Sequence, residues 1–355
     1  MRKLVIEKSA VKQNLSIIKQ RASGAVLYAV LTGDAGGCGI VPMAQLLRDE
    51  GIGHFAVSEV SEVEALRKAG FVDEEILMLR STTDHEQLQR LIDLNAVCTI
   101  SSVDTGMALN ALAENRSTVV EAHIQVDTGM GYGGFLVGEP EKILLAYRSL
   151  PNVALSGIYT QLHAGRPNDP QTKDQLDQFR RVLATIHTAG FETGIVHAAG
   201  SFALLHDDNA RLDGVRVGSA ILGRCRRTRD DGLRTVGYGQ APLSEVRWLP
   251  KGHTLGKDKP FVLKKPARIA VIPVGYQNGF GVIRPQSQGF WATILRWRNQ
   301  RQRYVRIGEQ RARVLGAIGA TQTLLDVTGL RCSAGDMALF DLDPLFAKGF
   351  VREYR

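Results

Sequence analysis

The sequence predicts two domains, an N-terminal (β/α)8 barrel of the TIM type in residues 1–225 and a mainly β domain in residues 226–355. Before residue 225, short apolar runs alternate with amphipathic helical segments, which is the pattern of a barrel of parallel strands. The strand runs are continuously apolar, as expected for strands that are buried on both faces. After residue 226 the runs are short and separated by turns, with few helices between them, which predicts the β domain.

Eight runs are candidate barrel strands, at 25–31, 54–59, 75–80, 96–101, 120–127, 155–162, 195–200 and 214–218. The segment 172–190 predicts a helix, because its apolar residues recur at helical spacing. These residues are Leu176, Phe179, Val182, Leu183 and Ile186. Asp84 and Asp104 stand where helix N-caps are expected. In the second domain the strand-like runs are 267–276, 311–320 and 336–343.

The composition is that of a soluble globular protein. Hydrophobic residues make up 44% and charged residues 23% of the 355 residues, which argues against a disordered chain. No apolar run approaches the roughly 18 residues of a membrane helix, and the first residues lack the long apolar stretch of a secretory signal. The four cysteines lie far apart, which argues against a zinc site and a disulfide framework. We therefore expect a cytoplasmic protein that does not bind a membrane.

Charge is distributed unevenly along the chain. Residues 226–355 carry 23 Lys and Arg against 10 Asp and Glu, whereas residues 1–225 carry 21 against 26. The densest basic stretch is 296–306, in which Trp297 and Tyr304 could stack on nucleic-acid bases. Alternatively, the stretch is a solvated β-hairpin whose arginines keep a sheet edge soluble. No helix-turn-helix, zinc-finger or RNA-binding signature accompanies it, so the hairpin is favoured and nucleic acid is not expected as a partner.

In a (β/α)8 barrel the active site lies at the carboxyl ends of the strands. Glycine-rich or polar segments follow five of the candidate strands, at 32–39, 127–135, 159–163, 197–201 and 216–219. Glycines there let the backbone approach a ligand closely, and backbone N–H groups suit a phosphate. Because barrels often bind phosphate near the seventh and eighth strands, Ser201, Gly218 and Ser219 are candidate phosphate donors.

Other constellations are weaker candidates. The residues 206–208 (His-Asp-Asp) are potential metal ligands, but adjacent residues on a turn do not converge on one ion, so no metal site is expected. Cys38 would be reactive only if a base lowered the pKa of its thiol. Asp34 and Asp127 are expected to be turn and cap residues rather than an acid and base pair.

The order of the strand-end segments, followed by the segment 273–279 with the sequence PVGYQNG, resembles the alanine racemase family. The resemblance extends from Leu27 to the terminal residues 351–355. It implies a fold-type III enzyme, an isomerase of amino acids that uses pyridoxal 5'-phosphate (PLP) as its cofactor. It also implies a head-to-tail homodimer of two-domain chains.

Several positions match functional residues of this family. The resemblance implies that Tyr276 is a catalytic acid or base contributed across the dimer. It implies that Arg216 donates to the pyridine nitrogen of PLP and that His197 supports Arg216. These three residues also have plainer interpretations, as an interface tyrosine, a salt-bridged barrel arginine and a core histidine. The positions that match phosphate contacts are Ser201, Gly218, Ser219 and Tyr354.

Thr32 stands at the position of the lysine that holds PLP as a Schiff base in the family. A hydroxyl cannot form an imine, and the same lysine normally serves as one of two general bases. No lysine occurs between Lys19 and Lys68, so a small shift of the alignment does not restore one. The covalent PLP chemistry is therefore predicted to be lost or altered, with PLP bound non-covalently or not at all.

Further positions depart from the family, most of them by placing a small residue where the family has a large polar one. They are Gly36 in place of a phosphate-binding tyrosine, Gln125 in place of a lysine, Tyr132 in place of an arginine, Gln161 in place of a histidine over the ring, Gly200 in place of an asparagine, and Ala320 and Thr321 in place of a Met-Asp pair. We expect these changes to widen the cavity at the barrel mouth and to remove its charges.

Several functions remain open at this point. We expect an alanine-racemase-like protein that binds a small molecule or an amino acid in the widened pocket, without covalent PLP chemistry. A divergent PLP-dependent racemase that still interconverts L- and D-alanine is the first alternative. An altered enzyme that keeps Tyr276 as acid or base, and a basic C-terminal domain that binds an anionic partner, are the others.

Overall fold

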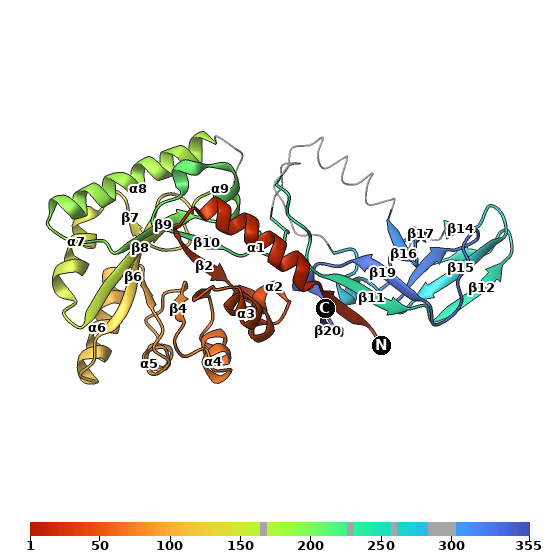
Figure 1. Ribbon diagram of the computed structural model, residues 1–355, viewed down its shortest axis with the longest axis horizontal. Helices are drawn as coiled ribbons and strands as arrows, with labels where there is room; N and C mark the ends of the chain where they lie inside the picture. Colours follow the sequence, from red (N-terminus) through yellow and green to blue (C-terminus); the bar gives the residue numbers. More distant parts are fainter. Residues whose placement is uncertain (164–168, 226–230, 257–260, 283–302) are drawn as a thin grey trace. The chain divides into compact units, whose positions relative to one another are not determined.

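The computed structural model describes residues 1–163, 169–225, 231–256, 261–282 and 303–355 (Figure 1). The chain divides into two compact units, which we call the barrel unit (residues 9–236) and the C-terminal unit (residues 1–8 with 237–355). The first residues join the C-terminal unit because β1 (Lys3–Ile6) pairs with two of its strands, β11 (Tyr238–Pro242) and β20 (Val351–Tyr354).

The barrel unit is built on parallel strands, as the sequence predicts. In sheet order the strands are β4 (Glu75–Met78), β3 (His54–Val57), β2 (Val26–Val30), β10 (Gly214–Val217), β9 (Ile195–Ala199), β8 (Val153–Thr160), β6 (Val120–Asp127) and β5 (Cys98–Ile100). A short additional strand, β7 (Phe135–Leu136), pairs with β6. A parallel bridge between Leu77 and Val97 connects the two ends of the sheet, so the barrel is nearly closed.

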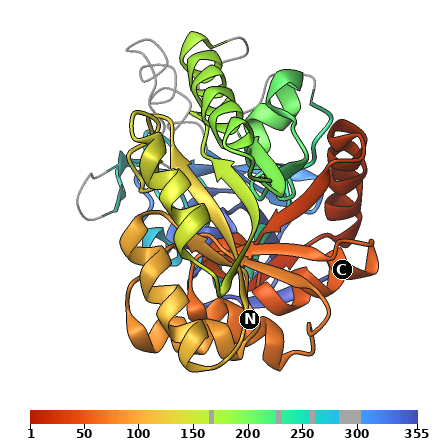
Figure 2. The ribbon, with the colours of Figure 1, turned by 90° about the vertical axis from the view of Figure 1, so that its left-hand side faces the viewer.

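Helices alternate with these strands and surround them (Figure 2). They are α1 (Lys8–Ala22), α2 (Thr32–Gly36), α3 (Ile40–Asp49), α4 (Val60–Lys68), α5 (His85–Asp93), α6 (Val103–Asn115), α7 (Pro140–Ser149), α8 (Pro170–Thr188) and α9 (Ser201–His206). In α8, the predicted apolar face is buried at Leu176, Phe179, Val182 and Ile186, whereas Leu183 is half-buried. No helix among the described residues combines the length and apolar character needed to cross a membrane.

One of the two predicted N-caps is confirmed and the other is wrong. The carboxylate of Asp84 accepts a hydrogen bond from the N–H of Gln87 at 2.8 Å and so caps α5. At α6 the cap is Ser102, not Asp104. The Ser102 hydroxyl accepts from the N–H of Thr105 at 3.2 Å, while the Thr105 hydroxyl accepts from the N–H of Ser102 at 3.0 Å. This reciprocal pair starts the helix earlier than predicted.

The C-terminal unit contains a nine-stranded sheet with the order β12-β15-β18-β17-β16-β19-β11-β1-β20, which confirms the predicted mainly β domain. The strands not yet located are β12 (Glu245–Leu249), β15 (Ala267–Ile272), β16 (Tyr304–Ile307), β17 (Gln310–Leu315), β18 (Thr323–Asp326) and β19 (Met337–Asp341). Neighbouring strands are antiparallel except β1 and β20, which are parallel.

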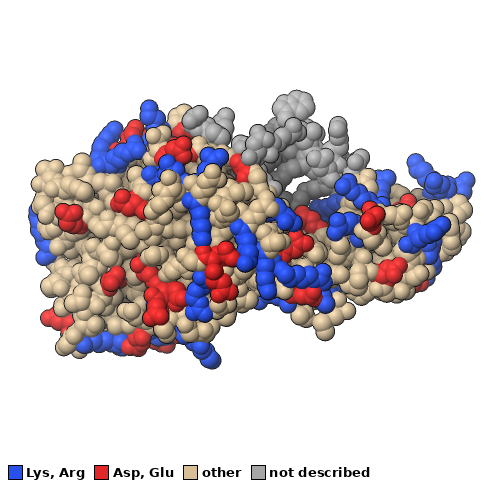
Figure 3. Space-filling view, in the orientation of Figure 1, with Lys and Arg blue, Asp and Glu red and all other residues tan. Residues whose placement is uncertain are grey.

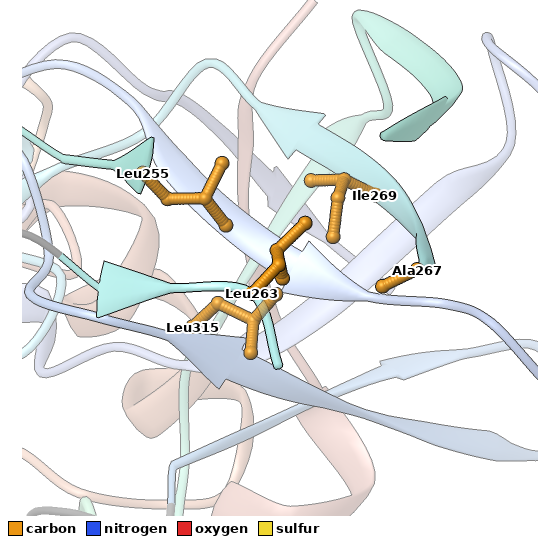
Figure 4. Close-up of a cluster of buried hydrophobic side chains, with 5 residues drawn as sticks. All are labelled: Leu255, Leu263, Ala267, Ile269 and Leu315. Carbon is orange, nitrogen blue, oxygen red and sulfur yellow. The ribbon is translucent and has the colours of Figure 1, made fainter. Parts of the chain in front are cut away.

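An apolar cluster joins this sheet to a short hairpin of β13 (Thr254–Leu255) and β14 (Phe261–Val262) (Figure 4). Its members, none more than 6% exposed, are Leu255, Leu263, Ala267, Ile269 and Leu315. Burying a leucine or isoleucine side chain contributes about 1.5–3 kcal/mol. The cluster therefore fixes the hairpin on one face of the sheet.

The arginine-rich segment is described only in part, since its residues 296–302 lie outside the described part of the chain. The remainder belongs to the antiparallel hairpin of β16 and β17. The cross-strand pairs on its exposed face are Arg306 with Arg311 and Tyr304 with Arg313. The described part of this segment is thus a hairpin with an exposed basic face.

Candidate active site

The first strand end of the barrel is a left-handed turn that begins at Thr32, directly after β2. Its φ angles are left-handed at Gly33 (66°), Asp34 (58°), Ala35 (55°) and Gly36 (61°). The N–H of Ala35 closes the turn by donating to the carbonyl oxygen of Leu31 at 2.7 Å. A left-handed backbone costs most residues about 1–2 kcal/mol each, a cost that glycine avoids. Gly33 and Gly36 therefore adopt these angles without that cost, whereas Asp34 and Ala35 bear it.

The carboxylate of Glu62, in the first turn of α4, holds the left-handed turn in place. Its Oε1 accepts a hydrogen bond from the N–H of Asp34 at 3.1 Å, and its Oε2 accepts from the N–H groups of Ser58 at 3.0 Å and Glu59 at 3.2 Å. The carboxylate of Asp34 in turn accepts from the N–H of Ile40 at 2.7 Å. Both carboxylates serve the backbone, so Asp34 acts as a turn residue, in agreement with its sequence-based interpretation.

The three candidate phosphate donors lie together where β9 and β10 end. Ser201 is the first residue of α9 and is 9% exposed. Its Oγ accepts from the N–H of Gly218 at 3.2 Å and from the N–H of Ala220 at 3.1 Å. Ser219 lies between these two residues in the chain. A Cβ at Gly218 would lie 3.0 Å from the carbonyl oxygen of Val30. Glycine there lets β10 approach β2 closely.

Arg216, on β10, lies inside the barrel and is 4% exposed. Its Nη1 donates to Nδ1 of His197 at 2.8 Å and to the carbonyl oxygen of His197 at 3.2 Å. Its Nη2 donates to the carbonyl oxygen of Thr160 at 2.7 Å and to Oε1 of Gln161 at 3.1 Å. The guanidinium carbon also lies 4.6 Å from the centre of the Tyr159 ring. All these acceptors are neutral, and burial lowers the pKa of Arg216 to about 10.

One donor of Arg216 remains available. A guanidinium carries five N–H groups, and the four hydrogen bonds above engage Nη1 and Nη2. Within the described part of the chain, no hydrogen bond engages Nε. A ligand with a neutral acceptor atom would satisfy this last N–H.

Behind Arg216, His197 and His123 form a buried pair. Nε2 of His197 lies 3.0 Å from Nδ1 of His123. Burial lowers the pKa of His197 well below its usual value and that of His123 to about 3, and the charge of Arg216 acts in the same direction. Both rings are therefore neutral at neutral pH. Because Nδ1 of His197 accepts from Arg216, we assign its proton to Nε2, which donates to His123.

Sequence reasoning missed His123, Tyr28 and Tyr159, which complete the polar interior of the barrel. The Tyr28 ring stacks on His197 with centroids 5.2 Å apart, and its hydroxyl donates to Oε1 of Glu75 at 2.8 Å. A signal for His123 existed in the strand 120–127, because polar residues alternate there with apolar ones. The polar positions are Glu121, His123, Gln125 and Asp127.

Asp127 is the last residue of β6, and Tyr132 and Gln161 lie on the loops after β6 and β8. Oδ1 of Asp127 accepts from the N–H groups of Gly129 at 2.8 Å and Met130 at 2.9 Å, which makes it a turn residue. Tyr132 is 79% exposed. Gln161 is exposed too, although its amide oxygen accepts from the buried arginine of β10.

In the C-terminal unit, Tyr276 lies on a loop beside Ala320 and Thr321. Its N–H donates to the carbonyl oxygen of Gly319 at 3.0 Å, and its side chain is 55% exposed. A Cβ at Gly275 would lie 2.1 Å from the same carbonyl oxygen. The two loops can therefore approach one another this closely only because residue 275 is glycine.

The structure divides the predicted site residues into two groups. Those of the C-terminal unit are Tyr276, Ala320, Thr321 and Tyr354, the last at the end of β20. Those of the barrel unit are Thr32, Gly36, Tyr132, Gln161, His197, Gly200, Ser201, Arg216, Gly218 and Ser219. Among the residues that the structure describes, no cluster of His, Cys, Asp and Glu could hold a metal ion.

The lysines of the barrel unit each lie on a helix, and none stands on a barrel strand or in the segment directly after one. They are Lys12 and Lys19 on α1, Lys68 on α4, Lys142 on α7 and Lys173 on α8. The strand-end segments 32–39, 127–135, 159–163, 197–201 and 216–219 therefore contain no lysine of their own.

Two family models match the chain: "Alanine racemase, N-terminal domain" over residues 6–225 and "Alanine racemase, C-terminal domain" over residues 238–343. Among similar proteins, an alanine racemase of Desulfovibrio desulfuricans is 29% identical over 342 residues, which cover 94% of this chain and 87% of the relative. An alanine racemase of Carboxydothermus hydrogenoformans is 30% identical over 276 residues, which cover 76% of this chain and 74% of the relative.

Solved structures of similar proteins support the fold. An alanine racemase of Clostridium difficile superposes with a TM-score of 0.86 at 21% identity, covering 100% of this chain and 95% of the other. An alanine racemase of Bartonella henselae, described as having covalently bound pyridoxal phosphate, superposes with a TM-score of 0.82 at 20% identity. That alignment covers 100% of this chain and 99% of the other.

Proposed function

The chain belongs to the alanine racemase family, and from that premise we propose that it is a non-covalent binding member of the family. It would hold PLP, or a ligand with the same ring and phosphate, without a bond to a lysine, and would not racemise alanine efficiently. The observation that carries this proposal is Thr32 at the end of β2. A hydroxyl cannot replace the amine of a lysine, and the lysines of the barrel unit lie on helices.

The barrel residues fit two parts of PLP. The pyridine nitrogen is a neutral acceptor. It suits the Nε–H of Arg216, which has no hydrogen-bond acceptor among the described residues. The phosphate suits the hydroxyl of Ser201, which accepts from the N–H of Gly218 and so directs its own proton outward, together with the backbone N–H of Ser219. The aldehyde of PLP finds no matching group, because position 32 offers no amine with which it could form an imine.

The loss of the lysine also removes a proton-transfer group. When bound, PLP supplies an electron-withdrawing ring that stabilises negative charge at the α-carbon of an amino acid. Racemisation needs one group to remove the α-proton and another to return a proton on the opposite face. Tyr276 matches one of these groups by its family position, whereas Thr32 is too weak a base to be the other. Since a positioned general base contributes about 10²–10⁴-fold, we expect racemisation to be slower by at least that factor.

We also propose that the pocket at the barrel mouth is wider than in lysine-bearing relatives. Position 200 supports this, because a Cβ added to Gly200 would have no neighbour closer than 3.9 Å. Position 36 supports it less, because a Cβ at Gly36 would lie 2.8 Å from Cδ1 of Leu222. The leucine side chain therefore occupies part of the space next to Gly36, and the room that is gained lies nearer to Gly200.

The proposal is tested by titrating the purified protein with PLP and following its near-ultraviolet and visible absorbance. Borohydride reduction and intact-mass measurement follow, together with an assay for D-alanine formed from L-alanine. We expect saturable binding, no mass gain after reduction and no efficient racemisation. A mass gain located on a lysine together with rapid racemisation would replace the proposal by the divergent racemase. An activity that Tyr276→Phe abolishes while ligand affinity stays unchanged would instead indicate an altered enzyme.

A second candidate function is the binding of an anionic partner by the C-terminal unit, favoured by the exposed face of the β16–β17 hairpin. Arg306 lies directly opposite Arg311, although like charges in this position destabilise a sheet. Lys and Arg side chains also gather on the visible face of this unit, with acidic side chains among them (Figure 3). The test is the affinity for a single-stranded oligonucleotide at two salt concentrations, compared with that of Arg306→Gln/Arg311→Gln. Equal affinities of the two proteins would exclude this face as the binding surface.

A further inference from the structure

We propose that the site recognises the phosphorylated pyridine ring and not the aldehyde of PLP, so that the aldehyde, amine and alcohol forms (pyridoxal, pyridoxamine and pyridoxine 5'-phosphate) bind with similar affinity. This inference rests on the proposed function and deepens it by naming the ligand class. In an enzyme with the lysine, only the aldehyde form gains the covalent bond. Here no strand-end segment contains a lysine that could form this bond. The basis for preferring the aldehyde form is therefore removed.

The groups that fit the ligand all address parts that the three forms share. Arg216 is held by four hydrogen bonds from Nη1 and Nη2 to neutral acceptors, which fix the guanidinium and leave its Nε–H to a ligand. Ser201 is held between two backbone N–H groups at 3.2 and 3.1 Å. The first group fits the ring nitrogen and the second fits the phosphate. Neither depends on the substituent that distinguishes the aldehyde, the amine and the alcohol.

The segment that carries Thr32 offers no amine of its own. The left-handed turn after Thr32 is closed by backbone hydrogen bonds and tied to Glu62, so it is a rigid segment. Two of the barrel unit's lysines are engaged by acidic side chains elsewhere, Lys12 by Glu50 at 2.6 Å and Lys142 by Glu139 at 2.9 Å. The hydroxyl of Thr32 can both donate and accept a hydrogen bond, so it suits an aldehyde, an amine or an alcohol.

The charge of the amine form gains little at the strand ends. The carboxylate of Asp34 accepts from the N–H of Ile40 at 2.7 Å, and that of Asp127 accepts from the N–H groups of Gly129 and Met130. Both carboxylates are thereby turned towards their own loops. The three forms then differ by about one hydrogen bond, which corresponds to about tenfold or less in affinity.

Isothermal titration calorimetry of the full chain with the three phosphorylated forms and with unphosphorylated pyridoxal tests this inference. We expect three dissociation constants within about tenfold of one another, and binding of pyridoxal weaker by about 100-fold or more because the charged phosphate contacts are lost. A preference for the aldehyde form above about 100-fold without a mass gain on reduction would overturn the inference and leave the proposed function standing. Failure of all three forms to bind would overturn the proposed function itself.

A matched pair of variants tests whether position 32 faces the distinguishing substituent. Thr32→Lys is expected to raise the preference for the aldehyde over the alcohol form by more than tenfold and to give a mass gain on borohydride reduction. Thr32→Val keeps the shape of the side chain and is expected to leave the three dissociation constants within the same narrow range. The decisive outcome is a Thr32→Lys variant that has the same melting temperature as the wild type and still shows neither the changed preference nor the mass gain. In that case position 32 does not face the ligand and the inference is wrong.

Discussion

Arg216 donates a hydrogen bond to Nδ1 of His197 at 2.8 Å, and His197 lies 3.0 Å from His123 in turn. This contact sets the direction of the whole chain of hydrogen bonds, because a histidine that accepts at Nδ1 must donate at Nε2 when neutral. The charge of Arg216 is therefore stabilised inside the barrel by neutral dipoles. The guanidinium is held rigidly, with one N–H left for a ligand.

The buried histidines predict that the barrel loses stability in mild acid. The pKa of His123 is lowered from 6.5 to about 3 in the folded state, whereas the unfolded chain takes up the proton near 6.5. The stability from keeping this ring neutral is thus fully present above pH 6.5 and is lost as the pH falls from 6.5 towards 3. Each such histidine contributes about 1.4 kcal/mol per pH unit in that window. Urea unfolding at pH 7, 6 and 5 measures the slope.

His123→Gln isolates this contribution, because a glutamine can accept from His197 without titrating. We expect the free energy of unfolding of the variant to fall less steeply with decreasing pH below 6.5 than that of the wild type. The difference in slope corresponds to one proton fewer taken up on unfolding, or about 1.4 kcal/mol per pH unit. His85→Gln, at an exposed position of α5, is the matched control and is expected to keep the wild-type slope. Equal slopes for wild type and His123→Gln would contradict the buried neutral pair.

Ser201→Ala is expected to weaken the binding of PLP by about 10- to 100-fold, because a hydrogen bond to a charged phosphate contributes about 1.5–3 kcal/mol. The variant removes the hydroxyl that lies beside the N–H of Gly218 at 3.2 Å. Calorimetry with PLP and with unphosphorylated pyridoxal measures the effect. An equal loss for both ligands would mean that Ser201 does not address the phosphate.

Glu62→Gln is expected to destabilise the barrel unit by about 1–3 kcal/mol, since a buried carboxylate that accepts from three backbone N–H groups is replaced by an amide. Glu64→Gln makes the same chemical change on the same helix. Its carboxylate pairs with Arg90 at the surface, so its effect should stay within about 0.5 kcal/mol. Urea unfolding compares the two. Similar losses would remove the role of Glu62 as the support of the left-handed turn.

Gly275→Ala is expected to disrupt the loop that carries Tyr276, because the added Cβ would lie 2.1 Å from the carbonyl oxygen of Gly319. A backbone atom cannot yield as a side chain can, so the expected destabilisation is about 3 kcal/mol or more. Gly329→Ala in the same unit has no neighbouring atom within 4 Å and serves as the control. Thermal unfolding of both variants measures the difference. A melting temperature of Gly275→Ala equal to that of the control would show that the loops can separate freely.

The barrel strands and the strand-end candidates could be predicted because their signals are local. Strand-like runs marked β2 to β6 and β8 to β10, whereas β7 was not predicted. The positions of Ser201 and Gly218 at the ends of the last two runs placed them at the same end of a parallel barrel. That position 32 is a threonine and that no lysine lies between Lys19 and Lys68 could also be read directly, since residue identity is local. Such features depend on residues that are neighbours in the sequence.

The polar interior of the barrel could not be predicted, because it joins residues from strands that are distant in the sequence. Tyr28, His123 and His197 come from three strands, and their contacts depend on how the barrel closes. The support of the left-handed turn by Glu62 has the same origin, since Asp34 and Glu62 lie on either side of β3.

The sequence by itself determined the barrel of parallel strands, the mainly β second domain and the absence of a lysine at position 32, because periodicity and residue identity are local properties. Only the tertiary structure decided that the first strand joins the C-terminal sheet beside β20, and that Arg216 is held by neutral partners with its Nε–H left over. Strand pairing and side-chain hydrogen bonding follow from the packing of distant segments, since a strand edge or a buried donor can be satisfied by any segment that the fold brings within reach.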